Sequence, residues 1–233
     1  MAQGGLLAVV AFCGLLLALH WRSTERRAVA FAFVTTLLLF LALRELPPLL
    51  PGERVLGHHW NWSGQLLAGA AVLLLAQRLV ARAGFRWREF GLTRKQRPGS
   101  LRPALSVTAA VLAVNYLLMS LSSFRLGAVP AETWLYQATV PGLVEETVFR
   151  GVLLALADRL WTPRWTVGGA AIGVGGLAVT VLFVALHGLS LHTLTGVLPA
   201  ALLYLWLRAR TGTLVAPILA HNTWNLSVYA AHL

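Results

Sequence analysis

Three stretches of this 233-residue chain place polar side chains that can do chemistry inside runs of apolar residues. These polar residues are Glu145, Glu146 and Arg150 in the first stretch, His187 in the second, with Phe183 four residues before it, and His221 and Asn225 in the third. A charged side chain inside a membrane is costly, so ionisable residues in apolar spans are functional candidates by default. Two adjacent glutamates in one span are especially hard to explain by packing.

Helical spacing separates the two glutamates by role. Glu146 and Arg150 are four residues apart, so on a helix they face each other and can form an ion pair. Glu145 points about 100° away around the helix and lacks that partner, which leaves its carboxylate available as a general base. The second and third stretches also present their pairs on one helical face each. Three helices can therefore offer polar groups to one cavity, while a purely structural role for the Glu146–Arg150 pair stays open.

The three motifs resemble those of the CAAX protease and bacteriocin-processing family, the glutamic intramembrane proteases that include the Ras-converting prenyl-protein endopeptidases. The family pattern is E-E-x-x-x-R, then F-x-x-x-H, then H-x-x-x-N on successive core helices, and this chain has all three in that order. The resemblance covers about residues 134–230, which would form the catalytic core helices. The resemblance does not extend to the first 100 residues.

The resemblance implies a mechanism of peptide hydrolysis. Glu145, assisted by His187, would activate a water molecule that attacks the scissile carbonyl. His221 and Asn225 would stabilise the oxyanion by hydrogen bonding. The supporting residues would be Glu146, Arg150 and Phe183. No metal and no cofactor are implied.

Composition places these motifs in a membrane protein. The chain is 58% hydrophobic and only 12% charged, with a mean hydropathy of +0.71, whereas soluble domains are about 45–50% apolar and about 25% charged. We expect an all-α, polytopic membrane bundle with one domain over residues 1–233. The single cysteine, Cys13, excludes an internal disulfide. The net charge of +11 lies between apolar segments, so it does not indicate nucleic-acid binding.

About 20 apolar residues cross a bilayer core of about 30 Å. On that criterion the sequence predicts about eight spans, at residues 4–20, 28–46, 61–81, 103–123, 136–157, 166–187, 192–208 and 213–231. The polar segment 82–102 is expected to be a helix or loop on an anionic membrane surface, or else a solvated linker.

The distribution of Lys and Arg predicts the orientation. The loops after odd-numbered spans hold 15 such residues, whereas the opposite loops hold only Arg44, Arg54 and Arg125. The positive-inside rule then puts both termini on the non-cytoplasmic side of the membrane, which we expect to be the bacterial cytoplasmic membrane. The candidate site would open outward. Its expected substrate is an exported, membrane-anchored protein with a C-terminal apolar segment, cut in C-terminal sorting or maturation, rather than a prenylated protein.

Two other functions remain open on the sequence alone. In the first, Glu145, His187 and His221 bind zinc, and a zinc-bound water is the nucleophile of a CAAX-type prenyl-protein endopeptidase. In the second, the same residues serve a proton-coupled transporter or a non-catalytic membrane partner. The family resemblance favours a protease over this second class.

Overall fold

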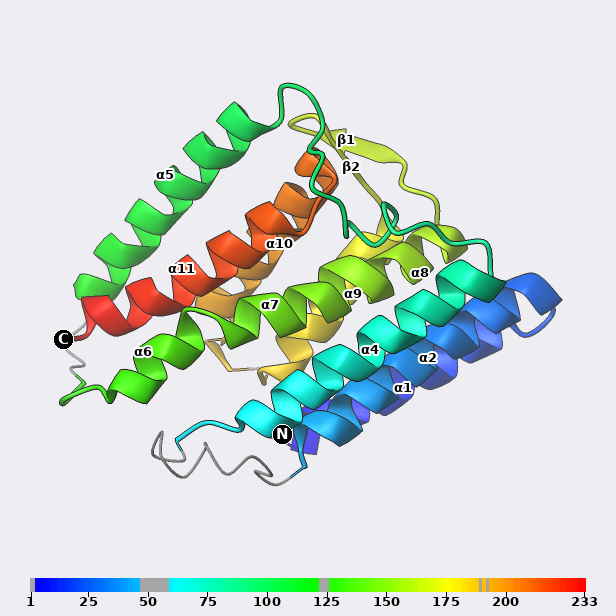
Figure 1. Cartoon of the computed structure of the whole chain (residues 1–233), viewed down its shortest axis with the longest axis horizontal. Helices are drawn as coiled ribbons and strands as arrows, with labels where there is room; N and C mark the ends of the chain where they lie inside the picture. The colour runs from blue at the N-terminus through cyan, green and yellow to red at the C-terminus, as the bar shows by residue number, and fades with distance from the viewer. Residues whose placement is uncertain (1–2, 47–58, 122–125, 189, 192) are drawn as a thin grey trace.

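The computed structural model describes residues 3–46, 59–121, 126–188, 190–191 and 193–233. Helices make up most of this part of the chain, and its two strands, of three residues each, form one short hairpin (Figure 1). The predicted all-helical class is thereby confirmed.

Three long helices form one side of the bundle. They are α1 (Gln3–His20), α2 (Thr24–Arg44) and α4 (Trp62–Arg82), and α2 packs against the other two (Figure 1). Asn61 caps the first turn of α4 and also donates its side-chain amide to the carbonyl of Arg44 at 3.0 Å. This one side chain therefore fixes the start of α4 against the end of α2.

A nearly continuous helix with a π-helical middle carries the two glutamates. The short helix α6 (Ala131–Gln137) comes first, followed by α7 (Val140–Glu146), the π-helical segment η1 (Thr147–Leu153) and α8 (Leu154–Leu160). The predicted span 136–157 lies within this run, which extends beyond it at both ends. π-Helical turns are rare and occur mostly at functional sites, and this one begins directly after the glutamate pair.

The sixth predicted span, 166–187, is wrong in its first third. A hairpin of β1 (Trp165–Val167) and β2 (Ala170–Ile172) replaces the helix there, because Gly168 and Gly169 turn the chain with φ of 54° and 75°. Helix α9 covers only Val174–Leu186. Its 13 residues give a length of about 20 Å, less than the hydrocarbon core.

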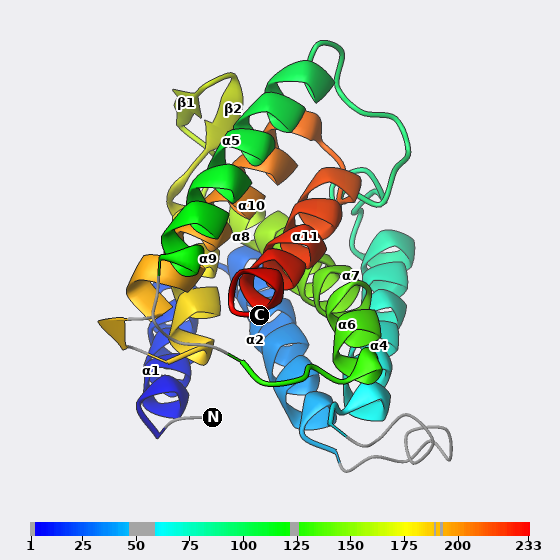
Figure 2. The ribbon, with the colours of Figure 1, turned by 90° about the vertical axis from the view of Figure 1, so that its left-hand side faces the viewer.

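The last helices complete the site. The π-helical segment η2 (Thr193–Val197) continues into α10 (Leu198–Thr211), and α11 (Val215–Ala231) follows after a turn at Gly212. Helix α5 (Leu101–Ser120) packs on α11 and α10. Figure 2 shows α11 with α5 on one side and α7 on the other.

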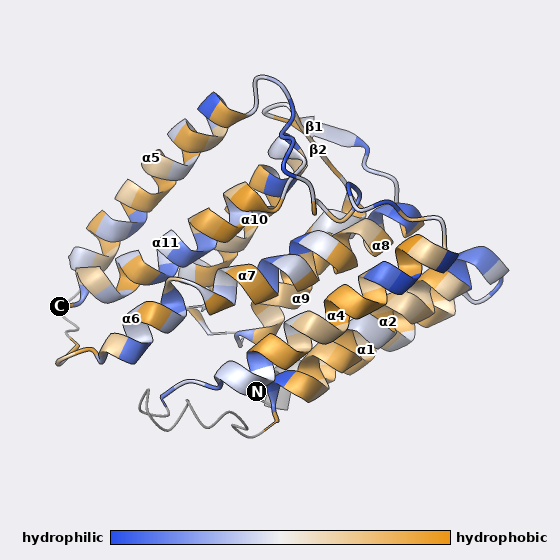
Figure 3. Cartoon of the chain, in the orientation of Figure 1, coloured by the Kyte–Doolittle hydropathy of each residue, from blue (hydrophilic) through white to orange (hydrophobic). Residues whose placement is uncertain are grey.

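The outer faces of the helices are apolar, as expected for contact with lipid (Figure 3). In the part of the chain that the structure describes, three helices are long and apolar enough to cross a membrane: α2, α4 and α5. Two shorter apolar helices lie at Leu7–His20 and Val174–Leu186. A helical membrane protein is therefore confirmed, whereas the count of about eight spans is not.

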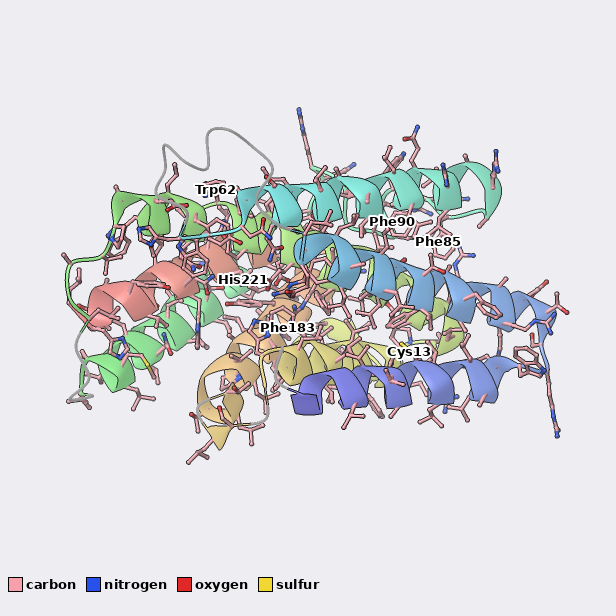
Figure 4. All side chains as sticks on the ribbon, turned by 90° about the horizontal axis from the view of Figure 1, so that it is seen from below. Cys13, Trp62, Phe85, Phe90, Phe183 and His221 are labelled. Carbon is pink, nitrogen blue, oxygen red and sulfur yellow. The ribbon has the colours of Figure 1, made fainter. Side chains whose placement is uncertain are left out.

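The polar segment 82–102 is mainly a loop, residues 83–100, which connects α4 to α5 and packs on one end of the bundle. Phe85 and Phe90 stack on each other in the core, with ring centroids 5.4 Å apart (Figure 4). The backbone N–H of Arg97 donates to the carbonyl of Thr211 at 2.9 Å. These contacts argue against a solvated linker.

The basic loops lie together at this end. The α1–α2 turn, the segment 82–102, the α8–β1 connection and the α10–α11 turn all approach it, whereas the start of α1 and the end of α11 lie at the other end (Figure 1). Of the three charges predicted for the opposite side, Arg54 and Arg125 lie outside the described residues, and Arg44 ends α2.

Candidate active site

A cavity of about 670 Å³ brings the four predicted catalytic residues together. Glu145 reaches it from α7, His187 from the end of α9, and His221 and Asn225 from α11. Residues from three motifs that are far apart in the sequence thus form part of the lining of one cavity, here called its wall. The predicted supporting residues lie behind that wall.

The two glutamates point in different directions, as the helical spacing predicts. Glu145 lines the cavity and is 8% exposed, whereas Glu146 is completely buried. The nearest ionisable partner of Glu145 is His221, with 4.0 Å between Oε2 and Nε2. This distance is too long for a direct hydrogen bond, but a water molecule beside the pair can contact both atoms.

The predicted Glu146–Arg150 ion pair is present and buried. Nη1 of Arg150 lies 3.3 Å from Oε1 of Glu146, and Nη2 donates to the carbonyl of Ala201 at 3.0 Å. The guanidinium carbon lies 4.2 Å from the ring centroid of Phe183 and 5.4 Å from that of Tyr204. Such cation–π contacts stabilise a desolvated cation, so the buried charge is compensated on several sides.

His221 connects this ion pair to the cavity. Its Nδ1 lies 2.8 Å from Oε1 of Glu146, and its ring stacks on Tyr204 with centroids 4.8 Å apart and an angle of 11°. An ionised carboxylate only accepts hydrogen bonds, so Nδ1 carries a proton that it donates to Glu146. Nε2 is therefore the atom presented to Glu145 and the cavity. Figure 4 shows His221 and Phe183 near the middle of the bundle.

His187 follows the last residue of α9 and is exposed to the cavity. Its ring packs on Phe183 with centroids 4.6 Å apart, and its Nδ1 lies 2.8 Å from the Phe183 carbonyl oxygen. Because a carbonyl only accepts, Nδ1 carries the proton and Nε2 has a free lone pair. Within the described residues, the imidazole within ion-pair distance of Glu145 is that of His221 rather than His187.

The side-chain amide of Asn225 is held by a residue that the motifs do not include. Nδ2 of Asn225 donates to Oε1 of Gln137 at 2.8 Å, and both side chains line the cavity. A primary amide has two hydrogens, so Asn225 keeps one donor for a ligand. Gln137 lies at the start of the predicted span 136–157, outside the three motifs, and the sequence carries no signal that connects it to Asn225.

Asn222 is a second functional position that the motif analysis missed. Its Oδ1 accepts from the backbone N–H of Gly142 at 2.8 Å, and its Nδ2 donates to the carbonyl of Thr139 at 3.4 Å. Asn222 therefore ties α11 to the first turn of α7, three residues before Glu145. The available signal was a buried amide adjacent to His221 in an apolar span.

Polar and aromatic contacts beside the cavity join the segment before α4 to α6. The carboxylate of Glu132 accepts hydrogen bonds from the backbone N–H of His59 and the indole of Trp62, both at 3.0 Å. Trp60 stacks on Tyr136 with ring centroids 4.7 Å apart, and these two side chains line the cavity. The chain entering α4 is thereby fixed to α6.

The arrangement can activate a water molecule and stabilise negative charge. It combines an accessible carboxylate, two imidazoles with fixed protonation at Nδ1 and an amide donor. Among the described residues, no three His, Cys, Asp or Glu side chains are grouped so that they could hold a metal ion. The zinc alternative, with Glu145, His187 and His221 as ligands, therefore gains no support from the geometry.

Comparison with known protein families gives a match in the second half of the chain. The family model described as Type II CAAX prenyl endopeptidase Rce1-like matches residues 127–227. No curated protein and no solved structure matches the chain. The matched range contains all three motifs and every lining residue with a predicted catalytic role. The resemblance is confirmed over this range, which is less than half of the chain and is similar to the Rce1-like endopeptidases.

Proposed function

We propose that the protein is an intramembrane endopeptidase of the glutamic type, with Glu145 as its general base. The observation that carries this proposal is the shared cavity: Glu145, His187, His221 and Asn225 line it together. Glu145 is the motif carboxylate that reaches this space, because Glu146 is fully buried in its pair with Arg150. The base is therefore distinguished from the structural carboxylate by exposure.

In the proposed reaction, the Glu145 carboxylate takes a proton from a water molecule as the water oxygen attacks the peptide carbonyl. The tetrahedral intermediate then collapses, the carbon–nitrogen bond breaks, and Glu145 returns the proton to the leaving amine. The free lone pair on Nε2 of His187 can accept a hydrogen bond from the same water. This is the assistance that the family resemblance implies.

His221 and Asn225 are proposed to stabilise the oxyanion. With Nδ1 bonded to the buried Glu146, the ring of His221 can carry a second proton on Nε2 and donate it as a hydrogen bond into the cavity. The negative charge of Glu146 stabilises the resulting imidazolium. Asn225 supplies the amide hydrogen that Gln137 leaves free. Donors fixed in this way need no rearrangement when charge develops on the substrate.

The proposed substrate is an exported protein held in the membrane by a C-terminal apolar helix. Arg44, Glu45 and Trp60 line the cavity at the end of the bundle opposite the basic loops. The positive-inside rule assigns the basic loops to the cytoplasm, so a cavity at the other end serves the outer side. Location in the bacterial cytoplasmic membrane and outward-facing termini belong to the same proposal.

The role of Glu145 is tested with a reporter that is exported and anchored by a C-terminal apolar helix with a basic tail. Cleavage shortens the reporter, and electrophoresis and mass spectrometry detect the shorter product. Glu145→Gln should abolish this cleavage. Glu45→Gln is the matched control, because Glu45 lines the same cavity but pairs with Arg44 at 3.6 Å. The control should keep most of the turnover. Normal cleavage by Glu145→Gln would show that the base is another group.

A farnesylated CAAX peptide in a parallel assay tests the alternative substrate. Cleavage of this peptide, with the reporter left intact, would favour prenyl-protein processing. A chelator added to the active enzyme tests the zinc alternative, since loss of activity that Zn²⁺ restores would require a metal. Absence of cleavage in every assay would instead favour a transporter or a non-catalytic partner.

The orientation is tested by cysteine labelling in a Cys13→Ser background. The two variants are Ser190→Cys and Thr162→Cys. Ser190 follows α9 and His187 of the cavity, whereas Thr162 lies in the connection after α8; both residues are exposed. Gly188 is less suitable because its φ of 99° strains any other residue. A membrane-impermeant thiol reagent applied from outside should label position 190 and not 162. The reverse pattern would restore a cytoplasmic substrate.

A further inference from the structure

A second cavity lies at the basic end of the bundle, away from the candidate active site. It has a volume of about 550 Å³ and lies between the segment 82–102, α8 and the end of α10. Five of its lining residues are cationic: Arg88, Lys95, Arg97, Arg159 and Arg208. Two carboxylates, Glu89 and Asp158, also line it, so its walls carry a net charge of +3 (five cations less two carboxylates).

Arg208 and Arg97 are held by backbone carbonyls, which are neutral, and of the two carboxylates in the cavity Asp158 offsets part of the charge of Arg208. Arg208 is 7% exposed, and it donates Nε to the carbonyl of Arg150 at 3.1 Å and Nη2 to the carbonyl of Glu89 at 2.7 Å. Arg97 donates Nη1 to the carbonyl of Ala209 at 2.7 Å. Each guanidinium has five N–H donors. Both residues therefore present fixed positive charge and spare donors.

The remaining cations are only partly neutralised. Arg159 pairs with Glu89, with Nη2 at 2.9 Å from Oε2. The side chains of Arg88 and Lys95 are exposed and make no hydrogen bond or ion pair with the rest of the described chain. These two residues are free to reach a ligand in the cavity.

We propose that this cavity binds the phosphate group of an anionic ligand. Guanidinium groups match phosphate oxygens with paired N–H donors, and lysine adds a point charge. The depth in the membrane fits the phosphates of lipid headgroups, because Trp21 and Trp87 are exposed at this end. Under the proposed orientation this end meets the cytoplasmic leaflet, which is rich in anionic lipid. A soluble phosphate offers the same chemistry.

Binding would stabilise the basic end without involving the catalytic groups. The phosphate would join the loop residues Arg88 and Lys95 to Arg208 on α10, and so hold the segment 82–102 on the bundle. We infer a site that secures the enzyme in an anionic membrane. The proposal does not depend on whether Glu145 acts as a base.

The test uses the purified full-length protein in a neutral detergent and measures thermal unfolding. The probes are inorganic phosphate, dioctanoyl phosphatidylglycerol and dioctanoyl phosphatidylcholine, with chloride added to match ionic strength. A ligand at a hundredfold excess over its Kd should raise Tm by about 5–10 °C. We expect this rise with phosphatidylglycerol and not with phosphatidylcholine. A rise with inorganic phosphate as well would show that the phosphate group alone suffices.

Two double variants separate the site from general surface charge. Arg88→Gln/Lys95→Gln should lose the rise in Tm, measured against its own Tm without ligand. Arg86→Gln/Arg94→Gln removes the same charge from the same exposed segment but from outside the cavity, and should keep the rise. The proposal fails if neither anionic probe raises Tm, if phosphatidylcholine does so equally, or if the two double variants behave alike.

Discussion

The buried pair of Glu146 and Arg150 should make a large and strongly coupled contribution to stability. Both side chains are at most 1% exposed, and Oε1 of Glu146 accepts from both Arg150 and His221. Removing one partner of a buried ion pair leaves an uncompensated charge and costs about 3–5 kcal/mol. We therefore expect Glu146→Gln and Arg150→Met each to lower the free energy of unfolding by that amount.

The double variant Glu146→Gln/Arg150→Met should be less destabilised than the sum of the single variants. With both charges gone, no unpaired charge remains, and the loss reduces to hydrogen bonds such as that of Arg150 to the Ala201 carbonyl, worth about 1 kcal/mol each. Because each single variant is expected to lose about 3–5 kcal/mol and the double variant only about 1–2 kcal/mol, the cycle should give a coupling energy of at least about 4 kcal/mol. Equilibrium unfolding in mixed micelles gives the free energy of unfolding of the wild type, the two single variants and the double variant.

Activity should not recover with stability in this double variant. A glutamine still accepts a hydrogen bond from Nδ1 of His221, but it no longer stabilises a positive charge on the ring. Cleavage of the anchored reporter should remain depressed even where folding is restored. Additive stability losses, or single variants within about 1 kcal/mol of the wild type, would refute the argument that the pair is a desolvated unit.

Three further predictions concern the surroundings of the base. His221→Ala and Asn225→Ala should each lower kcat by about 10²–10³ with little change in KM, and an unchanged kcat in both would make these residues structural. Gly142→Ala should destabilise the protein by about 1–3 kcal/mol in the same unfolding assay, because the added carbon meets Asn222 Oδ1 and lies 2.7 Å from the Ile218 carbonyl; wild-type stability would show that α7 and α11 can separate freely. For Glu132, which precedes the predicted span, burial favours a higher pKa, but hydrogen bonds from His59, Trp62 and Trp60 hold the pKa below its usual value of 4.5. Its contribution to stability should be present above that value and lost as pH falls through the lower folded pKa, and Glu132→Gln should remove this part of the acid-side loss in a pH series of thermal unfolding.

The sequence alone predicted the fold class and the residues that line the main cavity together. Apolar runs of about 20 residues predict transmembrane helices, which satisfy every backbone polar group within the segment. The four-residue spacing of Glu146 and Arg150 predicted their contact, because that spacing always brings side chains together on a helix. The same periodicity separated Glu145 from Glu146, and the structure places the first in the cavity and the second in the core.

Only the tertiary structure decided which groups meet across helices. The 2.8 Å contact between His221 and Glu146 joins residues 75 positions apart, and that between Asn225 and Gln137 joins residues 88 apart. Such contacts depend on how α6 and α7 pack on α11, and the hydrogen bond between Asn222 and Gly142 helps to set that packing. No spacing rule within one helix contains this information.

The limits of the spans also depended on local structure that hydropathy does not detect. The residues of the β1–β2 hairpin are apolar enough to extend the sixth predicted span, but two glycines with positive φ turn the chain before α9 begins. Likewise, the segment 82–102 is polar in composition, yet Phe85 and Phe90 insert into the core and hold it on the bundle. Average apolarity therefore predicted that the chain enters a membrane. Backbone turns and a few packed side chains determined where each helix starts and ends. Hydropathy could not predict these limits, because it measures transfer from water and not the geometry of the chain.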